Sequence, residues 1–223
     1  MQIEISEIIR SRRKTIAVEV RGDASIIVRS PGWVSEKVIK NFVEAKSAWI
    51  IKKQKEAGEK ISKSPKRNFA EGEEFFYLGD KYNLRVIDDQ DVPLKLDGCF
   101  MMSHQHRERA REIFTDWYRD EAARIIAKRA ELISGMSGRE YKKMKITSAR
   151  RRWGSCTTKG NINFSLFLVM APLRVIDYVV AHEISHLSEL NHSAKFWNKV
   201  GSLMPDFKEQ KIWLRENGHL LVI

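Results

Sequence analysis

Two histidines and a glutamate stand close together in the segment His182-Glu183-Ile184-Ser185-His186. Side chains four residues apart lie on one face of a helix, so the imidazoles of His182 and His186 are able to bind the same metal ion. Glu183 then points to the side of that pair, where its carboxylate accepts a proton from water without being a ligand. This spacing predicts the metal site of a zinc hydrolase, with Glu183 as its general base.

A catalytic zinc ion usually takes three protein ligands and leaves one position for water, so a third ligand is needed. His192 lies six residues after His186, and a sharp turn after Leu190 would return it to the metal. This is the spacing of metzincins, although they have Gly at the position of Glu189. Glu189 is the alternative ligand, because it shares a helical face with His182. We favour His192 and expect Glu189 to support the ligands or to be exposed.

The residues before His182 have the pattern of a buried helix that would carry the metal site. Pro172 suits the first helical turn, where its missing N–H is not needed. Apolar residues at helical spacing form one stripe: Leu173, Ile176, Val179, Val180, Ile184 and Leu187. Burying two imidazoles and a carboxylate there without partners would cost several kcal/mol, whereas a metal ion would satisfy them. The metal site is therefore favoured over a chance occurrence of the motif.

Apolar spacing predicts further helices around this one. Residues 106–133 have apolar positions at steps of three and four, which indicates a long amphipathic helix that ends near Gly135 and Gly138. After the metal-site helix, Ser193 is suited to cap a short helix, and Pro205 begins another.

Strands are predicted by short apolar runs that glycine-containing turns separate. Residues 15–20 and 24–29 would form a hairpin that turns at Gly22, and a helix would follow from Ser35 to Ile50. The next segment, 52–67, is rich in Lys and Arg without an apolar period, which favours a solvated helix end and a loop. The other expected segments are a hairpin at 75–87, a turn at 88–91, a strand pair at 94–102, a strand at 145–148, and an antiparallel pair at 151–156 and 162–166.

Composition limits the classes of protein that are compatible with this chain. Its 223 residues are 43% hydrophobic, enough for the core of one large domain or two small ones. We find no run of about eighteen apolar residues and no secretory leader, so we expect no membrane span and a cytoplasmic location. Cys99 and Cys156 are too few for a disulfide framework and should be reduced. The net charge of +11 would attract polyanions, which makes a nucleotide or nucleic acid a possible partner, although Lys-rich surfaces of soluble proteins often bind nothing specific.

Several motifs stand in the C-terminal half of the chain. They are RRWGSC at 151–156, INF at 162–164, VIDYVVAHEISH at 175–186, NHS at 191–193 and FW at 196–197. Together they resemble the YgjP-like (WLM-type) metallopeptidase domain, which is related to the SprT-like zincins. The similarity extends over nearly the whole chain and is most specific in residues 150–215. It implies Zn²⁺ bound by His182, His186 and His192, with Glu183 as general base.

The segment Arg151-Arg152-Trp153-Gly154-Ser155 is the candidate substrate-binding strand. An extended peptide pairs with an edge strand through backbone hydrogen bonds, and a strand just before the metal-site helix is suited to this role. In the structural alternative, Trp153 belongs to the core, Gly154 is a bulge and the arginines are solvated. Cys156 is expected to be a buried thiol rather than a ligand. Candidates for oxyanion stabilisation are Arg151, Arg152 and Tyr178.

We therefore predict an α+β fold with two regions. Residues 1–103 would form an N-terminal region of β-hairpins, mixed sheet and helix. Residues 104–223 would form a zincin-like core, in which a backing helix, a small antiparallel sheet and the HExxH active-site helix line a cleft. The predicted function is a zinc metallopeptidase that acts on peptides or proteins. One alternative is a metal-dependent nucleoside triphosphate pyrophosphatase that uses the arginines at 150–152; another is a nucleic-acid-associated protease, although no DNA-reading motif is present.

Overall fold

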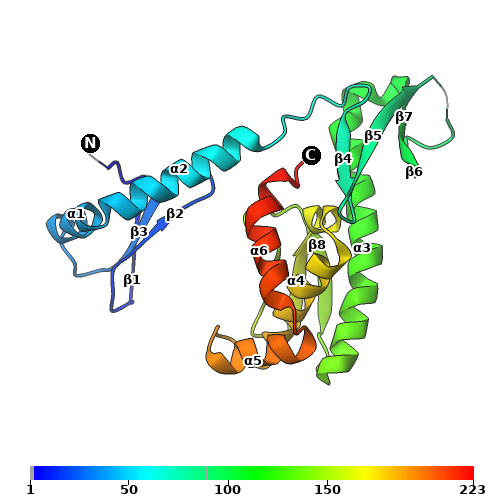
Figure 1. The fold of residues 1–223 in the computed structure, drawn as a ribbon. Coiled ribbons are helices and arrows are strands. Elements are labelled where there is room, and N and C mark those ends of the chain that lie inside the picture. The colour runs from blue at the N-terminus through cyan, green and yellow to red at the C-terminus, as the bar shows by residue number, and fades with distance from the viewer. Residues whose placement is uncertain (1–2, 89) are drawn as a thin grey trace. The chain divides into compact units, whose positions relative to one another are not determined.

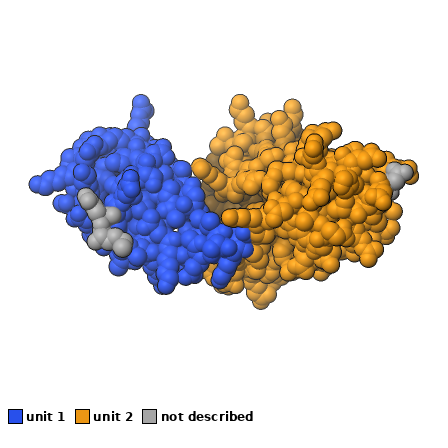
Figure 2. Space-filling model, turned by 90° about the horizontal axis from the view of Figure 1, so that it is seen from above, with its two compact units in different colours: residues 1–64 blue, residues 65–223 orange. Residues whose placement is uncertain are grey.

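The computed structural model describes residues 3–88 and 90–223, and the chain divides into two compact units at Ser64 and Pro65 (Figure 2). Each unit has its own hydrophobic core. The turn expected around residues 88–91 lies partly outside the described residues. None of the helices in the described part of the chain combines the length and the apolar character that crossing a membrane requires.

The first unit is a three-stranded sheet with two helices. Its elements are β1 (Glu7–Ser11), β2 (Ala17–Val20), β3 (Ile26–Pro31), α1 (Glu36–Ala45) and α2 (Ser47–Lys63). β2 and β3 form the predicted antiparallel hairpin, whereas the sequence did not predict β1, which pairs with β3 in parallel. Ile26 and Val28 of β3 share one core with Ile39 and Val43 of α1 and Ile50 of α2.

The helix predicted after Ser35 is in fact two helices. Ser35 caps the first one as predicted, because its side chain accepts a hydrogen bond from a backbone N–H of the first turn. The helix is then interrupted at Lys46. This interruption lets Ile50 of α2 join the core that α1 lines. Most of segment 52–67 belongs to α2, so the helical part of this segment is longer than the sequence predicted.

The second unit begins with a four-stranded sheet. Its strands are β4 (Glu74–Tyr77), β5 (Asp80–Ile87), β6 (Leu94–Asp97) and β7 (Cys99–Ser103), in the order β4-β5-β7-β6. Both predicted hairpins are present, and β5 pairs with β7 in parallel. The first hairpin turns at Gly79, which has φ +96°, and a Cβ there would lie 2.8 Å from Cγ of Pro172. Glycine therefore lets this turn touch the start of the metal-site helix.

This sheet shares its core with the long helix α3 (Ala110–Ser137), to which a short 3-10 helix η1 (His104–Arg109) leads. The ring of Phe75 stacks on Phe114 with 4.4 Å between centroids, and Phe100 lies 5.2 Å from Phe114. All three side chains are fully buried. The sheet and α3 therefore belong to one compact unit, whereas the sequence predicted a boundary between residues 103 and 104.

A second sheet lies next to α3 and carries the candidate substrate strand. Its strands are β8 (Lys143–Thr147), β9 (Gly154–Cys156) and β10 (Asn161–Ser165), in the order β8-β10-β9. β9 and β10 form the predicted antiparallel pair, but β8 pairs with β10 in parallel, so the sheet is mixed rather than antiparallel. The long connection through residues 148–160 makes the parallel pairing feasible. β9 is left at the edge of the sheet.

The remaining elements surround the metal-site helix. They are η2 (Leu166–Met170), α4 (Leu173–Ser185), α5 (Ala194–Leu203), α6 (Phe207–Asn217) and η3 (Gly218–Leu220). Helix α4 packs between α3 and α6 (Figure 1). The fold is the predicted α+β type, with small sheets and a backing helix behind the metal-site helix.

Candidate metal centre

Helix α4 is fixed in place by its apolar residues and by a buried ion pair. All but a few of its side chains are buried, and it carries His182 in its last turn with His186 as its C-cap residue. Asp177, which is 5% exposed, accepts two hydrogen bonds from Arg129 of α3, at 2.5 Å from Nε and 2.8 Å from Nη2. This bidentate pair sets the position of α4 against the backing helix.

A turn after α4 brings His192 back to the other two histidines. The N–H of Glu189 donates to the carbonyl of Ser185 at 3.1 Å, and Glu189 has no positive φ, so this turn does not require a glycine. Oδ1 of Asn191 then accepts from the N–H of Ser193 at 3.2 Å, and Ser193 caps α5 as predicted. His192 is thus held between a turn and a helix start.

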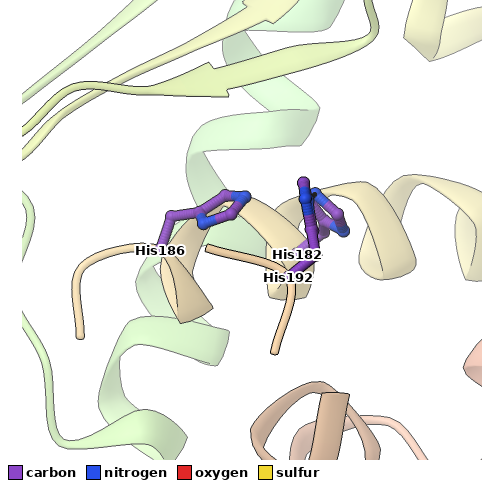
Figure 3. Close-up of side chains that lie close together, drawn as sticks. All are labelled: His182, His186 and His192. Atoms are coloured by element: carbon purple, nitrogen blue, oxygen red, sulfur yellow. Dashed lines mark hydrogen bonds between the residues drawn. The ribbon is translucent and has the colours of Figure 1, made fainter. Parts of the chain in front are cut away.

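The three histidines meet at one point (Figure 3). Each offers a ring nitrogen, and these nitrogens all lie within 4.8 Å of one another. Nε2 of His182 is 3.1 Å from Nε2 of His192. Two nitrogens that bind one tetrahedral zinc ion at about 2.0–2.1 Å lie roughly 3.3 Å apart. Three imidazoles are also a donor set that suits zinc and not the oxygen-seeking Mg²⁺ or Ca²⁺. The residues therefore fit a zinc ion.

The electrostatics of this cluster favour the neutral form of His182 and His192. Burial lowers the pKa of His182 to about 3, helped by the neighbouring His186 and His192 and by the charge of Lys211. Burial, His186 and Lys211 also lower the pKa of His192. Nδ1 of His182 is buried without a hydrogen-bond partner among the described residues. A neutral imidazole has a free lone pair, which is the form that binds metal.

Glu189 contributes to the cluster through its backbone. Nδ1 of His186 lies 2.9 Å from the carbonyl oxygen of Glu189, and the N–H of the ring donates to that oxygen. This hydrogen bond leaves the lone pair of Nε2 free to face the other histidines. Within the described chain, the carboxylate of Glu189 is not part of the group of converging ligand atoms, whereas His192 is.

Two aromatic residues of α5 pack against the histidines. The ring of Phe196, which is fully buried, lies 4.9, 4.4 and 4.8 Å from the rings of His182, His186 and His192. Trp197 stacks on His192 at 5.7 Å with an interplanar angle of 25°. Both residues are part of a sequence motif, but the sequence analysis assigned them no role. Their spacing after the cap residue Ser193 could have indicated their position, because it places them in the first turn of α5.

Glu183 lies directly against Gly154, the first residue of β9. A Cβ at position 154 would come within 2.6 Å of Oε1 of Glu183, so no side chain fits there. Gly154 pairs regularly with Phe164 of β10 and is not a bulge. Burial raises the pKa of Glu183 to about 8, and the charge of Arg152 opposes this shift. The carboxyl group is therefore enclosed between α4 and the edge strand.

The free edge of β9 offers backbone groups next to Glu183. The carbonyl of Trp153 and the N–H of Thr157 each form a 2.9 Å hydrogen bond to β10. Because an antiparallel strand alternates the direction of its backbone groups, those of Ser155 also point to β10. The N–H and C=O groups of Gly154 and Cys156 therefore point away from β10, toward the open edge.

The other predicted substrate residues lie in different surroundings. Trp153 packs on Gly218, where an added Cβ would be 2.8 Å from its ring, so its side chain is part of the core. Oγ of Ser155 accepts a hydrogen bond from Nδ2 of Asn163 at 3.2 Å. Arg151 and Arg152 are exposed.

Two further groups near Glu183 keep their protons at neutral pH. Burial and the charge of Glu183 raise the pKa of Cys156 to about 11 and that of Tyr178 to about 12. Within the described chain, Cys156 is not among the converging ligand atoms. Cys156 is therefore a protonated thiol outside the histidine cluster, and Tyr178 retains an O–H that can donate a hydrogen bond.

The site combines a helix that carries two histidines and a glutamate, a third histidine on the following turn, and an adjacent edge strand. These are the features of a metallopeptidase. A family model described as "YgjP-like, metallopeptidase domain" matches residues 14–217. The chain therefore belongs to the YgjP-like family and is a hydrolase of the metallopeptidase type. This membership implies a divalent metal ion and a peptide or protein substrate.

Similarity to individual proteins is more limited. The metallopeptidase zymogen of Pyrococcus abyssi abylysin is a solved structure that is similar to this chain, with a TM-score of 0.39 and 19% sequence identity. The similarity covers 44% of this chain and 99% of that chain. No match was found among curated proteins.

Proposed function

We propose that this chain is a zinc-dependent peptidase in which His182, His186 and His192 hold the metal and Glu183 is the general base. The observation that carries the proposal is the convergence of three imidazoles beside a buried carboxyl group. The 3.1 Å separation of two Nε2 atoms supports a small ion with nitrogen ligands.

When bound, zinc supplies a Lewis acid that polarises the scissile carbonyl and makes water more acidic. Glu183 accepts a proton from the attacking water at its carboxylate and delivers it to the nitrogen of the leaving amine. A raised pKa suits this exchange, because a base must both take up and release the proton near the operating pH. Tyr178 is the candidate donor to the developing oxyanion, because its raised pKa keeps its O–H and it interacts electrostatically with Glu183.

The substrate strand is proposed to work through its backbone. An extended peptide would add to β9 as a further strand and bond to the outward N–H and C=O groups of Gly154 and Cys156. Of the predicted substrate residues, Gly154 has the support of its contact with Glu183. Trp153 and Ser155 would act by shaping the strand, and Arg151 and Arg152 would lie at its exposed start.

The test is peptide cleavage by the intact chain after removal and return of zinc. Chelation should abolish cleavage, and one equivalent of zinc should restore it. The matched control is Glu183→Gln, which keeps the shape of the side chain but cannot accept the proton. It should bind zinc normally and lose about 1,000-fold or more in turnover. Near-normal turnover in that variant would exclude Glu183 as the base.

Arg152 also supports a second candidate, the hydrolysis of nucleoside triphosphates. Its charge acts on Glu183, and guanidinium groups match phosphate oxygens well. Pyrophosphate release from a nucleoside triphosphate, lost in the double variant Arg151→Ala and Arg152→Ala while peptide cleavage persists, would favour this reaction. A nucleic-acid partner has no support from the family match, which names a metallopeptidase domain.

A further inference from the structure

A groove of about 510 Å³ adjoins the histidine cluster. The end of α3, the start of β8, the β9–β10 turn and the end of α4 line it. The residues that matter here are Arg139, Lys142, Thr157, Lys159, Gly160 and His186. His186 belongs both to this groove and to the candidate metal centre, so the two are continuous. We call this feature the basic groove.

The basic groove is lined by more cationic than anionic side chains. Arg139, Lys142 and Lys159 are exposed, and none of them forms an ion pair within residues 3–88 and 90–223. The carboxylate in its lining is that of Glu140, so cations outnumber it three to one. Unpaired charges of one sign in a hollow attract a ligand of the opposite sign.

The walls of the basic groove are held by backbone hydrogen bonds. The N–H of Lys142 donates to the carbonyl of Gly160 at 2.8 Å, and the N–H of Gly160 donates to the carbonyl of Thr157 at 2.9 Å. Gly160 has φ +78°, a conformation that favours glycine, and a Cβ there would touch Lys142 and Leu187. Lys159 therefore lies in a hydrogen-bonded turn. Lys142 lies directly before β8, and its backbone is bonded to that turn.

The basic groove also continues the line of β9. Thr157, which lines the groove, directly follows Cys156, the last residue of β9. A peptide that pairs with β9 and has its scissile bond near Glu183 advances about 3.4 Å per residue. It spans the three residues from Gly154 to Thr157 in roughly 10 Å. Side chains about two to four residues from the scissile bond would therefore reach the groove.

We propose that the basic groove is a substrate subsite for acidic side chains, and that the enzyme prefers peptides with Asp or Glu two to four residues from the cleaved bond. This inference rests on the proposed peptidase function and extends it to a substrate class. The occupant is an acidic peptide segment because the groove is open, polar, cationic and in line with the edge strand.

The test compares three peptides of one sequence with the zinc-loaded, full-length chain. One has three Asp residues on the N-terminal side of the scissile bond, one has them on the C-terminal side, and one has Ser or Asn there. One of the two acidic peptides should be cleaved with a kcat/KM about tenfold higher than the neutral peptide, at low salt. Equal rates for all three would overturn the proposal.

The variants locate this preference in the groove. The double variant Lys142→Glu and Lys159→Glu should lose the preference for the acidic peptide and cleave the neutral peptide within about threefold of the wild type. Lys128→Glu with Lys208→Glu is the matched control, because both lysines are exposed outside the groove and the change in net charge is the same. The proposal fails if the control loses the preference equally, since that would show an effect of overall charge.

A binding measurement separates this inference from the proposed function. Fluorescence anisotropy of the labelled acidic peptide with Glu183→Gln protein reports affinity without turnover. Affinity for the acidic peptide should fall about tenfold in the groove variant and hold in the control. If neutral and acidic peptides are cleaved alike, the inference fails and the peptidase function stands. If no peptide is cleaved while acidic binding still depends on the groove lysines, the subsite survives and the proposed function fails.

Discussion

The histidine cluster and the edge strand β9 contribute different kinds of groups to one site. The cluster consists of side chains, and aromatic rings of α5 pack against all three imidazoles. The strand contributes backbone groups and a glycine that has no room for a side chain beside Glu183. Metal binding should therefore be sensitive to loss of side chains, whereas catalysis should be sensitive to the addition of atoms at the strand.

The largest effect is expected from a substitution in the aromatic packing around the histidine cluster. Phe196→Ala removes a fully buried ring beneath the three imidazoles and should destabilise the protein by about 3–5 kcal/mol. Chemical denaturation measures the change, and zinc titration should show weaker binding. Phe196→Leu is the control, since it fills most of the volume and should recover most of the stability. An unchanged denaturation midpoint in Phe196→Ala would contradict the role of this ring.

The second effect concerns Glu183, whose buried carboxyl group lies between the histidine cluster and β9. Below about pH 4.5, Glu183 is protonated in both the folded and the unfolded chain. Above about pH 4.5, Glu183 ionises in the unfolded chain, whereas burial keeps it protonated in the folded chain up to about pH 8. Stability of the metal-free protein is therefore lost as pH rises through this window. Glu183→Gln lacks this titration, so at pH 8 it should be more stable by a few kcal/mol.

Denaturation of both metal-free proteins between pH 5 and pH 8 measures this difference. The gap between variant and wild type should shrink toward the acid end of that range. Comparing the two proteins cancels the contribution of His182, whose lowered pKa acts in the opposite direction at acid pH. A gap that stays constant with pH would show that Glu183 does not titrate abnormally in the folded protein.

A smaller effect is expected when an atom is added on the strand side. Gly154→Ala places a Cβ where Oε1 of Glu183 lies and should displace the carboxyl group, with a loss of about 100-fold in turnover. Zinc content should not change, because the histidines lie elsewhere on α4 and after it. Ser155→Ala, one residue further along β9, should change turnover only a few-fold. Normal turnover in Gly154→Ala would show that the catalytic carboxyl group does not depend on this contact.

The smallest effect concerns the charge at the start of the strand. Arg152 lowers the pKa of Glu183, so Arg152→Ala should raise that pKa and move the acidic limb of the peptidase pH profile to higher pH. The rate at a fixed acid pH should fall by less than about tenfold, because Arg152 is exposed. Arg152→Lys keeps the charge and should shift the limb less. A shift toward lower pH would reverse the assigned sign.

The sequence predicted the parts of the molecule that depend on local patterns. Apolar spacing predicted α3 and α4, cap residues predicted the starts of α1 and α5, and short apolar runs separated by glycine-containing turns predicted the two hairpins of the second unit. His182, His186 and His192 were predicted as ligands from spacing and the resemblance together, and their ring nitrogens lie within 4.8 Å of one another.

Other features depend on contacts between distant residues and were missed for that reason. The parallel pairing of β8 with β10 leaves no local signal, because each strand alone reads the same in either direction. The role of Glu189 is carried by its carbonyl, which every residue type has. The contact of Gly154 with Glu183 joins two segments that are separated by a turn, a strand, a 3-10 helix and most of an α-helix.

Zinc content after dialysis against a mild chelator shows whether His182, His186 and His192 form one zinc site. The wild type should retain one zinc per chain. His192→Ala should lose its zinc, because only two strong protein ligands remain in that variant. Glu189→Ala should retain it, because the substitution leaves the backbone carbonyl that accepts from His186. Zinc retained by His192→Ala but lost from Glu189→Ala would contradict the account and make the carboxylate of Glu189 the third ligand.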